Sequence, residues 1–261
     1  MTATAAALKQ TNTPSQPDID FYHERGYLPW RKVLDDRELD ILRHEYDRIF
    51  ELGTSSGECR DLSTGEQRQS HAPSAKPMLQ IMQLCERSLI FRKLLYHGPI
   101  LDVFRSIIGP NFMLFHDQAL FKPAHHGGPV PWHQDNAYWQ CRPANLMSCW
   151  LTLDDVTAEN GAMHFVSGSH LRPVWHGPRT DTTALVDAAG QQLDTSGSVV
   201  VPLPAGACLF HHCQTLHYTQ PNTTGRQRRA FIIHVMLPGT RDRDGQAMRA
   251  SFARPVLSQE T

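Results

Sequence analysis

The stretch Pro131-Trp132-His133-Gln134-Asp135 decides how this chain is interpreted. Residues two apart on a β-strand point to the same face, so a strand here would aim the His133 imidazole and the Asp135 carboxylate at one point. Two histidines and one carboxylate on one face of an octahedron are the ligand set of non-haem Fe(II) oxygenases. His217, in Leu216-His217-Tyr218-Thr219, is the candidate third ligand. The competing interpretation is an inward polar pair satisfied by hydrogen bonds.

Composition narrows the function classes. The chain has 261 residues, a formal net charge of -1 and a pI near 6.9, with no basic block, which argues against nucleic acid and favours a small-molecule substrate. No apolar run approaches the ~20 residues of a membrane span and no signal peptide is evident, so we expect no membrane partner and a cytoplasmic location. The six cysteines show no disulfide framework. The sequence carries no indication of oligomeric state.

The first part of the chain predicts a tail followed by helices. Residues 1–18, rich in Thr, Ala, Ser, Gln and Pro, predict a disordered tail before one domain spanning 19–261. Helices are expected within about 35–108, over the amphipathic run that begins at Asp35 and over 79–96 and 99–108. The polar stretch 54–77 predicts a long loop that could close over a site.

After Pro110 the pattern changes to short apolar runs separated by Gly, Pro and Asn. Strands are expected around Trp132 and over 113–121, 147–153, 163–166, 198–201, 207–210 and 230–237. Helices first and strands afterwards predict a mainly β fold, with a barrel over about 112–240 and a helical buttress. Residues 168–197 form a long insertion, a second candidate wall over the site.

A second histidine cluster runs from Gly206 to Asn222 and offers His211, His212 and His217. A zinc site is a rival interpretation, because two cysteines and two histidines lie close together there, namely Cys208, His212, Cys213 and His217. Their spacing differs from the paired ligand spacing of structural zinc fingers.

Arg228 opens a strand that starts basic and then turns apolar. A guanidinium buried in a barrel requires an anion, and it can hold a carboxylate through two parallel hydrogen bonds. An iron site beside an arginine-held dicarboxylate is what a 2-oxoglutarate-dependent oxygenase requires. The alternative for Arg226, Arg228 and Arg229 is a solvated basic turn, which we expect for at least one of them.

Several motifs in order resemble the phytanoyl-CoA dioxygenase family of Fe(II)/2-oxoglutarate oxygenases, over about Phe21 to Pro238. The motifs are Phe21-Tyr22-His23-Glu24-Arg25-Gly26-Tyr27, Ile107-Ile108-Gly109-Pro110, Trp132-His133-Gln134-Asp135, Trp150-Leu151-Thr152-Leu153-Asp154-Asp155, Glu159-Asn160-Gly161-Ala162, Gly168-Ser169-His170, His217 to Asn222, and Arg228. The resemblance implies a double-stranded β-helix core, a jelly roll of the cupin kind, with N-terminal helices.

The resemblance also implies roles for individual residues. His133, Asp135 and His217 match the iron ligands, and Arg228 matches the residue that binds the distal carboxylate of 2-oxoglutarate. Thr219 stands where the family usually has a serine that helps to bind the same carboxylate. Other matching positions are Gln118 and Trp150, which would line the cosubstrate pocket, and Asn222, which would support the site.

The implied reaction consumes O₂ and 2-oxoglutarate, releases succinate and CO₂, and hydroxylates or otherwise oxidises a small metabolite. A natural product or an amino-acid derivative is the expected substrate. Relatives that halogenate lack the carboxylate that Asp135 supplies, so its presence favours hydroxylation, desaturation or ring closure. The alternatives are a metal-dependent hydrolase or isomerase on a cupin-like barrel, and a metal-binding protein without catalysis. His125 and His126 could face substrate or solvent.

Overall fold

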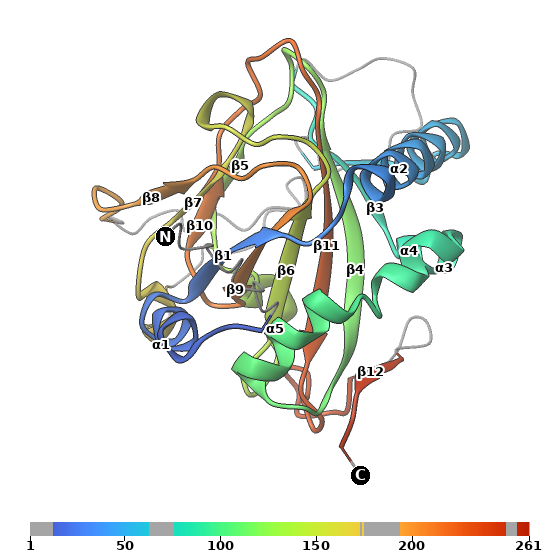
Figure 1. Ribbon diagram of the computed structural model, residues 1–261. Coiled ribbons are helices and arrows are strands. Elements are labelled where there is room, and N and C mark those ends of the chain that lie inside the picture. Colours follow the sequence, from blue (N-terminus) through green and yellow to red (C-terminus); the bar gives the residue numbers. More distant parts are fainter. Residues whose placement is uncertain (1–12, 63–75, 173, 175–193, 249–254, 261) are drawn as a thin grey trace, which may run out of the picture.

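The computed structural model describes residues 13–62, 76–172, 174, 194–248 and 255–260 (Figure 1). The strands are β1 (Tyr27–Lys32), β2 (Arg60–Asp61), β3 (Leu79–Met82), β4 (Phe112–Lys122), β5 (Val130–His133), β6 (Met147–Thr152), β7 (Met163–Phe165), β8 (Val199–Val201), β9 (Ala207–His212), β10 (His217–Thr219), β11 (Arg228–Met236) and β12 (Val256–Ser258). The α-helices are α1 (Gln16–Arg25), α2 (Asp36–Ser56), α3 (Leu84–Arg87), α4 (Leu89–Leu94), α5 (Gly98–Ile108) and α6 (Asn136–Trp139).

The described strands form two antiparallel sheets. The larger sheet has the order β1-β9-β6-β11-β4-β3-β2, with β12 paired to β4, and the smaller sheet has the order β5-β10-β7-β8. Two such sheets packed face to face make a jelly roll, so the predicted mainly β fold with a double-stranded β-helix core and N-terminal helices is confirmed.

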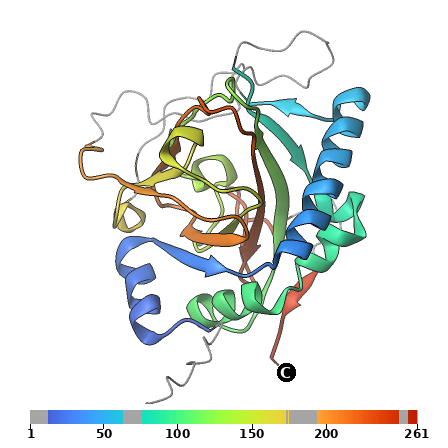
Figure 2. The same cartoon turned by 45° about the horizontal axis from the view of Figure 1, so that its top comes forward.

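Strand alternation gives the larger sheet two different faces. On β11, the central strand, Phe231, Ile233 and Val235 pack outward into the main apolar core, whereas Ala230 and Ile232 join a second cluster inside the roll. The outward residues meet the helices, since Leu39 of α2, Phe91 of α4 and Phe104 of α5 belong to the same cluster. Figure 2 shows α2 and α4 on that outer side and the smaller sheet on the opposite side.

Helix α2 begins after a capping residue, Asp35, and ends before a glycine, Gly57. The Asp35 side chain accepts a hydrogen bond from the Glu38 backbone N–H at 2.8 Å, and the Glu38 carboxylate accepts the Asp35 backbone N–H at 2.8 Å. This reciprocal pair satisfies donors that a helix start otherwise leaves free. Gly57 ends the helix with φ 76°, a conformation that glycine adopts without strain.

Three expected boundaries are corrected. Gln16 to Asp18 begin α1 instead of ending a disordered tail, because the Asp18 carboxylate caps the helix by accepting the Ser15 backbone N–H at 2.9 Å. Leu79–Met82 is a strand and not the start of a helix; Gln80 faces the interior of the roll while its neighbours face the helices. The expected loop over 54–77 overlaps the end of α2 and includes β2.

Parts of two expected loops, residues 63–75 and 175–193, lie outside the described residues, as do residues 1–12 of the expected tail. Strand β10, which carries His217, was not among the expected strands, because three residues are too few to show an alternating pattern.

Phe91 tests the packing of the helices on the sheet. Its ring is fully buried, with its centroid 4.9 Å from that of Phe231. We expect Phe91→Ala to lower the free energy of unfolding by about 3–5 kcal/mol in urea denaturation, because the substitution leaves a cavity. Leu89, on the same helix, is 72% exposed, so Leu89→Ala should change stability by less than about 0.5 kcal/mol. Equal losses of unfolding free energy in both variants would contradict the described packing.

Candidate active site

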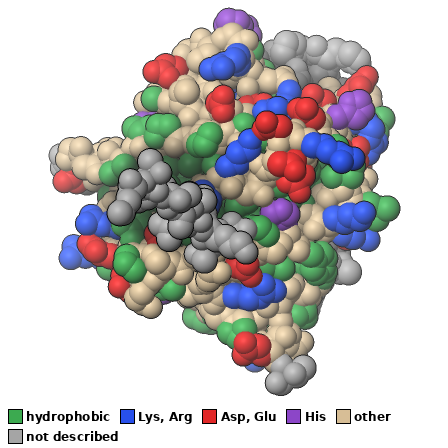
Figure 3. All heavy atoms as spheres, in the orientation of Figure 1, with side chains coloured by type: hydrophobic (Ala, Val, Ile, Leu, Met, Phe, Trp, Pro, Cys, Tyr) green, Lys and Arg blue, Asp and Glu red, His purple; other side chains and the backbone are tan. Residues whose placement is uncertain are grey.

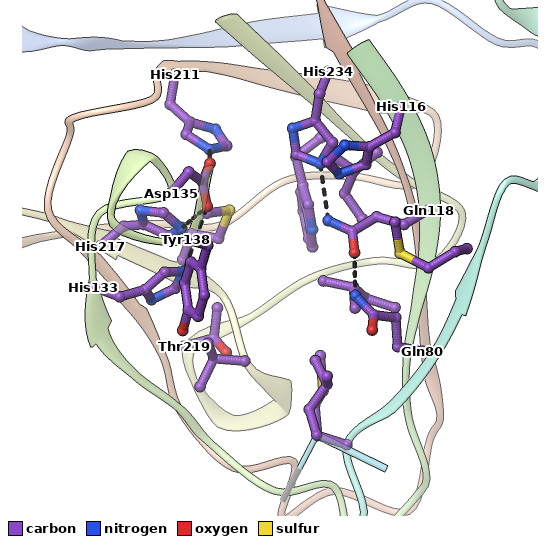
Figure 4. A pocket seen from close by; sticks show the side chains of 18 of the residues that line it. Gln80, His116, Gln118, His133, Asp135, Tyr138, His211, His217, Thr219 and His234 are labelled. Atoms are coloured by element: carbon purple, nitrogen blue, oxygen red, sulfur yellow. Dashed lines mark hydrogen bonds and ion pairs between the residues drawn. The ribbon is translucent and has the colours of Figure 1, made fainter. Parts of the chain in front are cut away.

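A cavity of about 370 Å³ lies between the two sheets. Its walls combine residues of the smaller sheet and of α6 with inward-facing residues of β3, β4, β6, β9 and β11. In Figure 4, His133, Asp135, His217 and His211 lie on one side of the cavity, and Gln80, Gln118, His116 and His234 lie on the other. These polar groups stand in a wall that is otherwise largely apolar, apart from Arg60, Thr219 and Arg228.

The pairing of β5 with β10 brings two histidines together. His217 lies directly opposite His133 in the antiparallel register, and the two ring centroids are 4.1 Å apart. Each ring donates its Nδ1–H to a backbone carbonyl two residues earlier, His133 to Pro131 at 2.8 Å and His217 to Thr215 at 2.9 Å. These hydrogen bonds fix the tautomer, so that both Nε2 atoms are free to bind a metal.

Asp135 completes the group in a way that the strand argument did not predict. Strand β5 ends at His133, and Asp135 has the helical dihedrals φ -54° and ψ -40° at the start of α6. This turn of the chain, and not strand alternation, aims its Oδ1 at the histidines, 3.6 Å from His133 Nε2 and 3.8 Å from His217 Nε2. The ligand atoms of the three residues lie within 4.8 Å of one another.

Burial sets the charges at this group. Burial lowers the pKa of His217 well below its usual value, so the imidazole is neutral at neutral pH. Two imidazoles and one carboxylate, without a thiolate, fit Fe(II) in its two-histidine, one-carboxylate site.

Besides the metal-binding group, Arg228 and Thr219 line the same cavity as a polar pair. Arg228 is 1% exposed, and burial lowers the pKa of its guanidinium to about 10, so it stays charged. One of its nitrogens donates to the Leu120 carbonyl at 3.2 Å, but its Nε and the Thr219 Oγ1 have no hydrogen-bond partner among the described residues. Buried donors without partners are rare and costly, so this pair fits an anionic ligand.

Strand alternation separates the three arginines of this segment. Arg228 faces the cavity, whereas Arg229 points outward and forms ion pairs with Asp47 at 3.0 Å and Asp154 at 3.2 Å. Arg226 is exposed in the turn before β11. Of these three arginines, Arg228 alone lines the cavity, which Arg60 on β2 lines as well.

The remaining expected cavity residues also line it. Trp150, 3% exposed, lies beside Arg228, with the guanidinium carbon 5.4 Å from its ring centroid. Gln118 lines the opposite wall and accepts a hydrogen bond from the Gln80 amide, and Gln80 is a cavity residue that sequence reasoning missed. Asn222 lies outside the cavity lining and donates to the Pro123 carbonyl at 3.0 Å and the Arg226 carbonyl at 2.7 Å, so it holds the turn before β11.

The other histidines separate by position. His211 lines the cavity, whereas His212 points to the opposite face of β9 and burial lowers its pKa to about 4. His125 and His126 are exposed and do not line the cavity. Within the described ranges, the triad is the only group of three or more His, Cys, Asp or Glu residues that could hold a metal ion, so the rival zinc site is not formed.

A jelly roll with such a group in its cavity is the architecture of the 2-oxoglutarate-dependent oxygenases. The model of the phytanoyl-CoA dioxygenase (PhyH) family matches residues 22–230, and the chain belongs to that family. It is therefore an oxygenase-type enzyme that uses iron, 2-oxoglutarate and O₂. The family match favours an oxygenase over the alternatives of a metal-dependent hydrolase or isomerase and of a binding protein.

Individual similarities are moderate in identity and broad in coverage. A probable alpha-ketoglutarate-dependent hypophosphite dioxygenase of Stutzerimonas stutzeri is 26% identical over 217 residues, covering 81% of this chain and 75% of the relative. The carbocyclase SnoK from nogalamycin biosynthesis superposes with a TM-score of 0.72 at 25% identity, covering 88% and 87%. The epimerase SnoN, solved with Fe³⁺, alpha-ketoglutarate and nogalamycin RO, has a TM-score of 0.72 at 24% identity, covering 91% of both chains.

Charges of both signs are mixed on one face of the molecule. On the face shown in Figure 3, acidic and basic side chains are interspersed, and neither sign forms an extended patch of the kind that binds nucleic acid. Among the described helices, none is both long and apolar enough to cross a bilayer.

Thr219→Val tests whether the hydroxyl lacks a partner in the ligand-free protein. Valine has nearly the same shape, so we expect the free energy of unfolding to stay within about 0.5 kcal/mol or to rise. The affinity for 2-oxoglutarate, measured by calorimetry with Mn²⁺ in place of iron, should fall about 10-fold, because a hydrogen bond to a charged group is worth about 1.5 kcal/mol or more. A loss of stability without a loss of affinity would mean that the hydroxyl serves the fold.

Proposed function

We propose that this enzyme oxidises an unactivated C–H bond of a small organic metabolite, with hydroxylation as the basic outcome. His133, Asp135 and His217 would hold the iron, and Arg228 with Thr219 would hold 2-oxoglutarate. One observation carries the proposal: a metal-binding group and a buried, unsatisfied anion-binding pair share one cavity. Asp135 favours hydroxylation, desaturation or ring closure over halogenation, since its carboxylate takes the place that a halide would need.

Bound iron would supply the oxidising chemistry, with 2-oxoglutarate and O₂ as co-reactants and succinate and CO₂ as products. The chain's own residues would prepare the site. The carbonyls of Pro131 and Thr215 hold the two imidazoles in the metal-binding tautomer. Arg228 and Thr219 would grip the far carboxylate of the cosubstrate and so fix the direction in which it lies. Trp150 packs beside the guanidinium and keeps it in place.

The cavity also constrains the substrate. Its volume falls within the range of ~300–1,000 Å³ typical of small-molecule sites, and it must accept 2-oxoglutarate as well. The wall that remains is mostly apolar and aromatic, with Leu62, Met78, Met82, Phe115, Val130, Tyr138 and Trp139 among its members, and it also carries the polar residues Arg60, Gln80 and His116. We therefore propose a compact substrate with an apolar body, such as a natural product or an amino-acid derivative.

Arg228→Ala tests the cosubstrate site. We expect 2-oxoglutarate affinity to fall by about 100-fold or more, because the buried cation that pairs with the distal carboxylate is lost. Arg226→Ala is the matched control, since it removes an exposed guanidinium two residues away and should leave affinity unchanged. Calorimetric titration with 2-oxoglutarate measures both variants. Unchanged affinity in Arg228→Ala would overturn the assignment of Arg228 and, with it, the placement of the cosubstrate.

A further inference from the structure

Four polar residues stand in register across the inner face of the larger sheet. His116 on β4 pairs with His234 on β11, His234 pairs with Ser148 on β6, and Ser148 pairs with His211 on β9. Ser148 is fully buried, and His211 and His234 are each 2% exposed. Such a polar row inside a sheet is costly unless its members are hydrogen-bonded.

The row reaches the metal-binding group at Asp135, whose two oxygens face different partners. Oδ2 accepts a hydrogen bond from His211 Nε2 at 3.0 Å and one from Ser148 Oγ at 3.5 Å. Oδ1 is the oxygen that faces the Nε2 atoms of His133 and His217. One oxygen is thus held by the protein, and the other is directed at the metal position.

The hydrogen bonds behind Ser148 have one consistent direction. The Gln80 amide donates to Gln118 Oε1, which leaves the Gln118 amide to donate to His234 Nε2 at 2.8 Å. His234 must then carry its proton on Nδ1, from which it donates to Ser148 Oγ at 2.7 Å. Ser148 in turn has its hydroxyl proton free for Asp135. In this row of hydrogen bonds from Gln80 to Ser148, every donor therefore points towards the Asp135 carboxylate.

The tautomer of His211 follows from the same reasoning. Its Nδ1 has no partner among the described residues. A proton on Nδ1 would leave a buried donor unpaired and would turn the Nε2 lone pair towards a carboxylate. The Nε2–H form avoids both costs, so His211 is a donor to Asp135.

We propose that His211 and the chain Gln118–His234–Ser148 are positioning residues that hold Asp135 for metal binding through Oδ1 alone. The inference rests on the proposed function, in which Asp135 is a ligand. By occupying Oδ2, these donors prevent the carboxylate from chelating the metal with both oxygens. Coordination positions on a bound metal would then stay open for 2-oxoglutarate and O₂.

The test uses Co²⁺ as the probe, because its d–d absorption reports coordination geometry. We expect His211→Phe to weaken Co²⁺ binding to the full-length protein by about 10- to 100-fold and to change the spectrum, as loss of a partner of a metal ligand typically does. His211→Gln keeps an N–H donor near the same place and should recover most of the affinity and the original spectrum. Wild-type affinity and an unchanged spectrum in His211→Phe would overturn the proposal.

Ser148→Ala provides a second test that removes only one hydroxyl. We expect weaker Co²⁺ binding in this variant too, while thermal unfolding of the metal-free protein shows that it remains folded. If His211→Phe does not fold, this variant alone decides: unchanged Co²⁺ affinity and spectrum in folded Ser148→Ala would count against the proposal.

Nitrogen NMR of the metal-free protein tests the direction of the chain. We expect His234 to be protonated on Nδ1 and His211 on Nε2. The opposite tautomer at either residue would overturn the proposed direction of the hydrogen bonds towards Asp135.

Asp135→Ala separates this inference from the proposed function. If wild type binds Co²⁺ no better than Asp135→Ala, then Asp135 is not a ligand and the proposed function fails. If Asp135→Ala loses Co²⁺ binding while the His211 and Ser148 variants keep it, only the positioning role fails.

Discussion

The antiparallel pairing of β5 with β10 is the constraint on which the site depends. It sets His133 opposite His217, so two imidazoles face one point before any ligand is present. Their Nδ1–H groups are used by nearby carbonyls, and burial keeps His217 neutral. The chain then turns at Asp135 and adds a carboxylate to the same point. Backbone register and one turn thus account for a metal-binding geometry that no single motif encodes.

The larger sheet serves two purposes through its two faces. Its outer side residues, such as Phe231 and Ile233, are buried under the helices and stabilise the roll. Its inner side carries Arg228, Trp150, Gln118 and the polar row that ends at Asp135. Because both faces belong to the same strands, the rigid helical packing also fixes the geometry of the site.

The fold was largely predictable, because apolar runs, turn residues and family motifs all pointed to helices followed by strands. The convergence of His133, Asp135 and His217 was expected for a partly incorrect reason, since alternation along one strand does not place Asp135. His211 could not be assigned from sequence, because its role depends on which strand lies beside β9. Leu79–Met82 was mistaken for helix because its alternation is only four residues long.

The most direct test is an anaerobic titration of the protein with Fe(II) followed by 2-oxoglutarate, observed in the visible spectrum. An Fe(II) bound by two imidazoles and one carboxylate has open positions for chelation by the 2-oxo acid. We expect a metal-to-ligand charge-transfer band that appears only when both are present and saturates at one equivalent of each. A folded protein that binds Fe(II) but gives no band with 2-oxoglutarate would contradict the proposed arrangement of metal and cosubstrate.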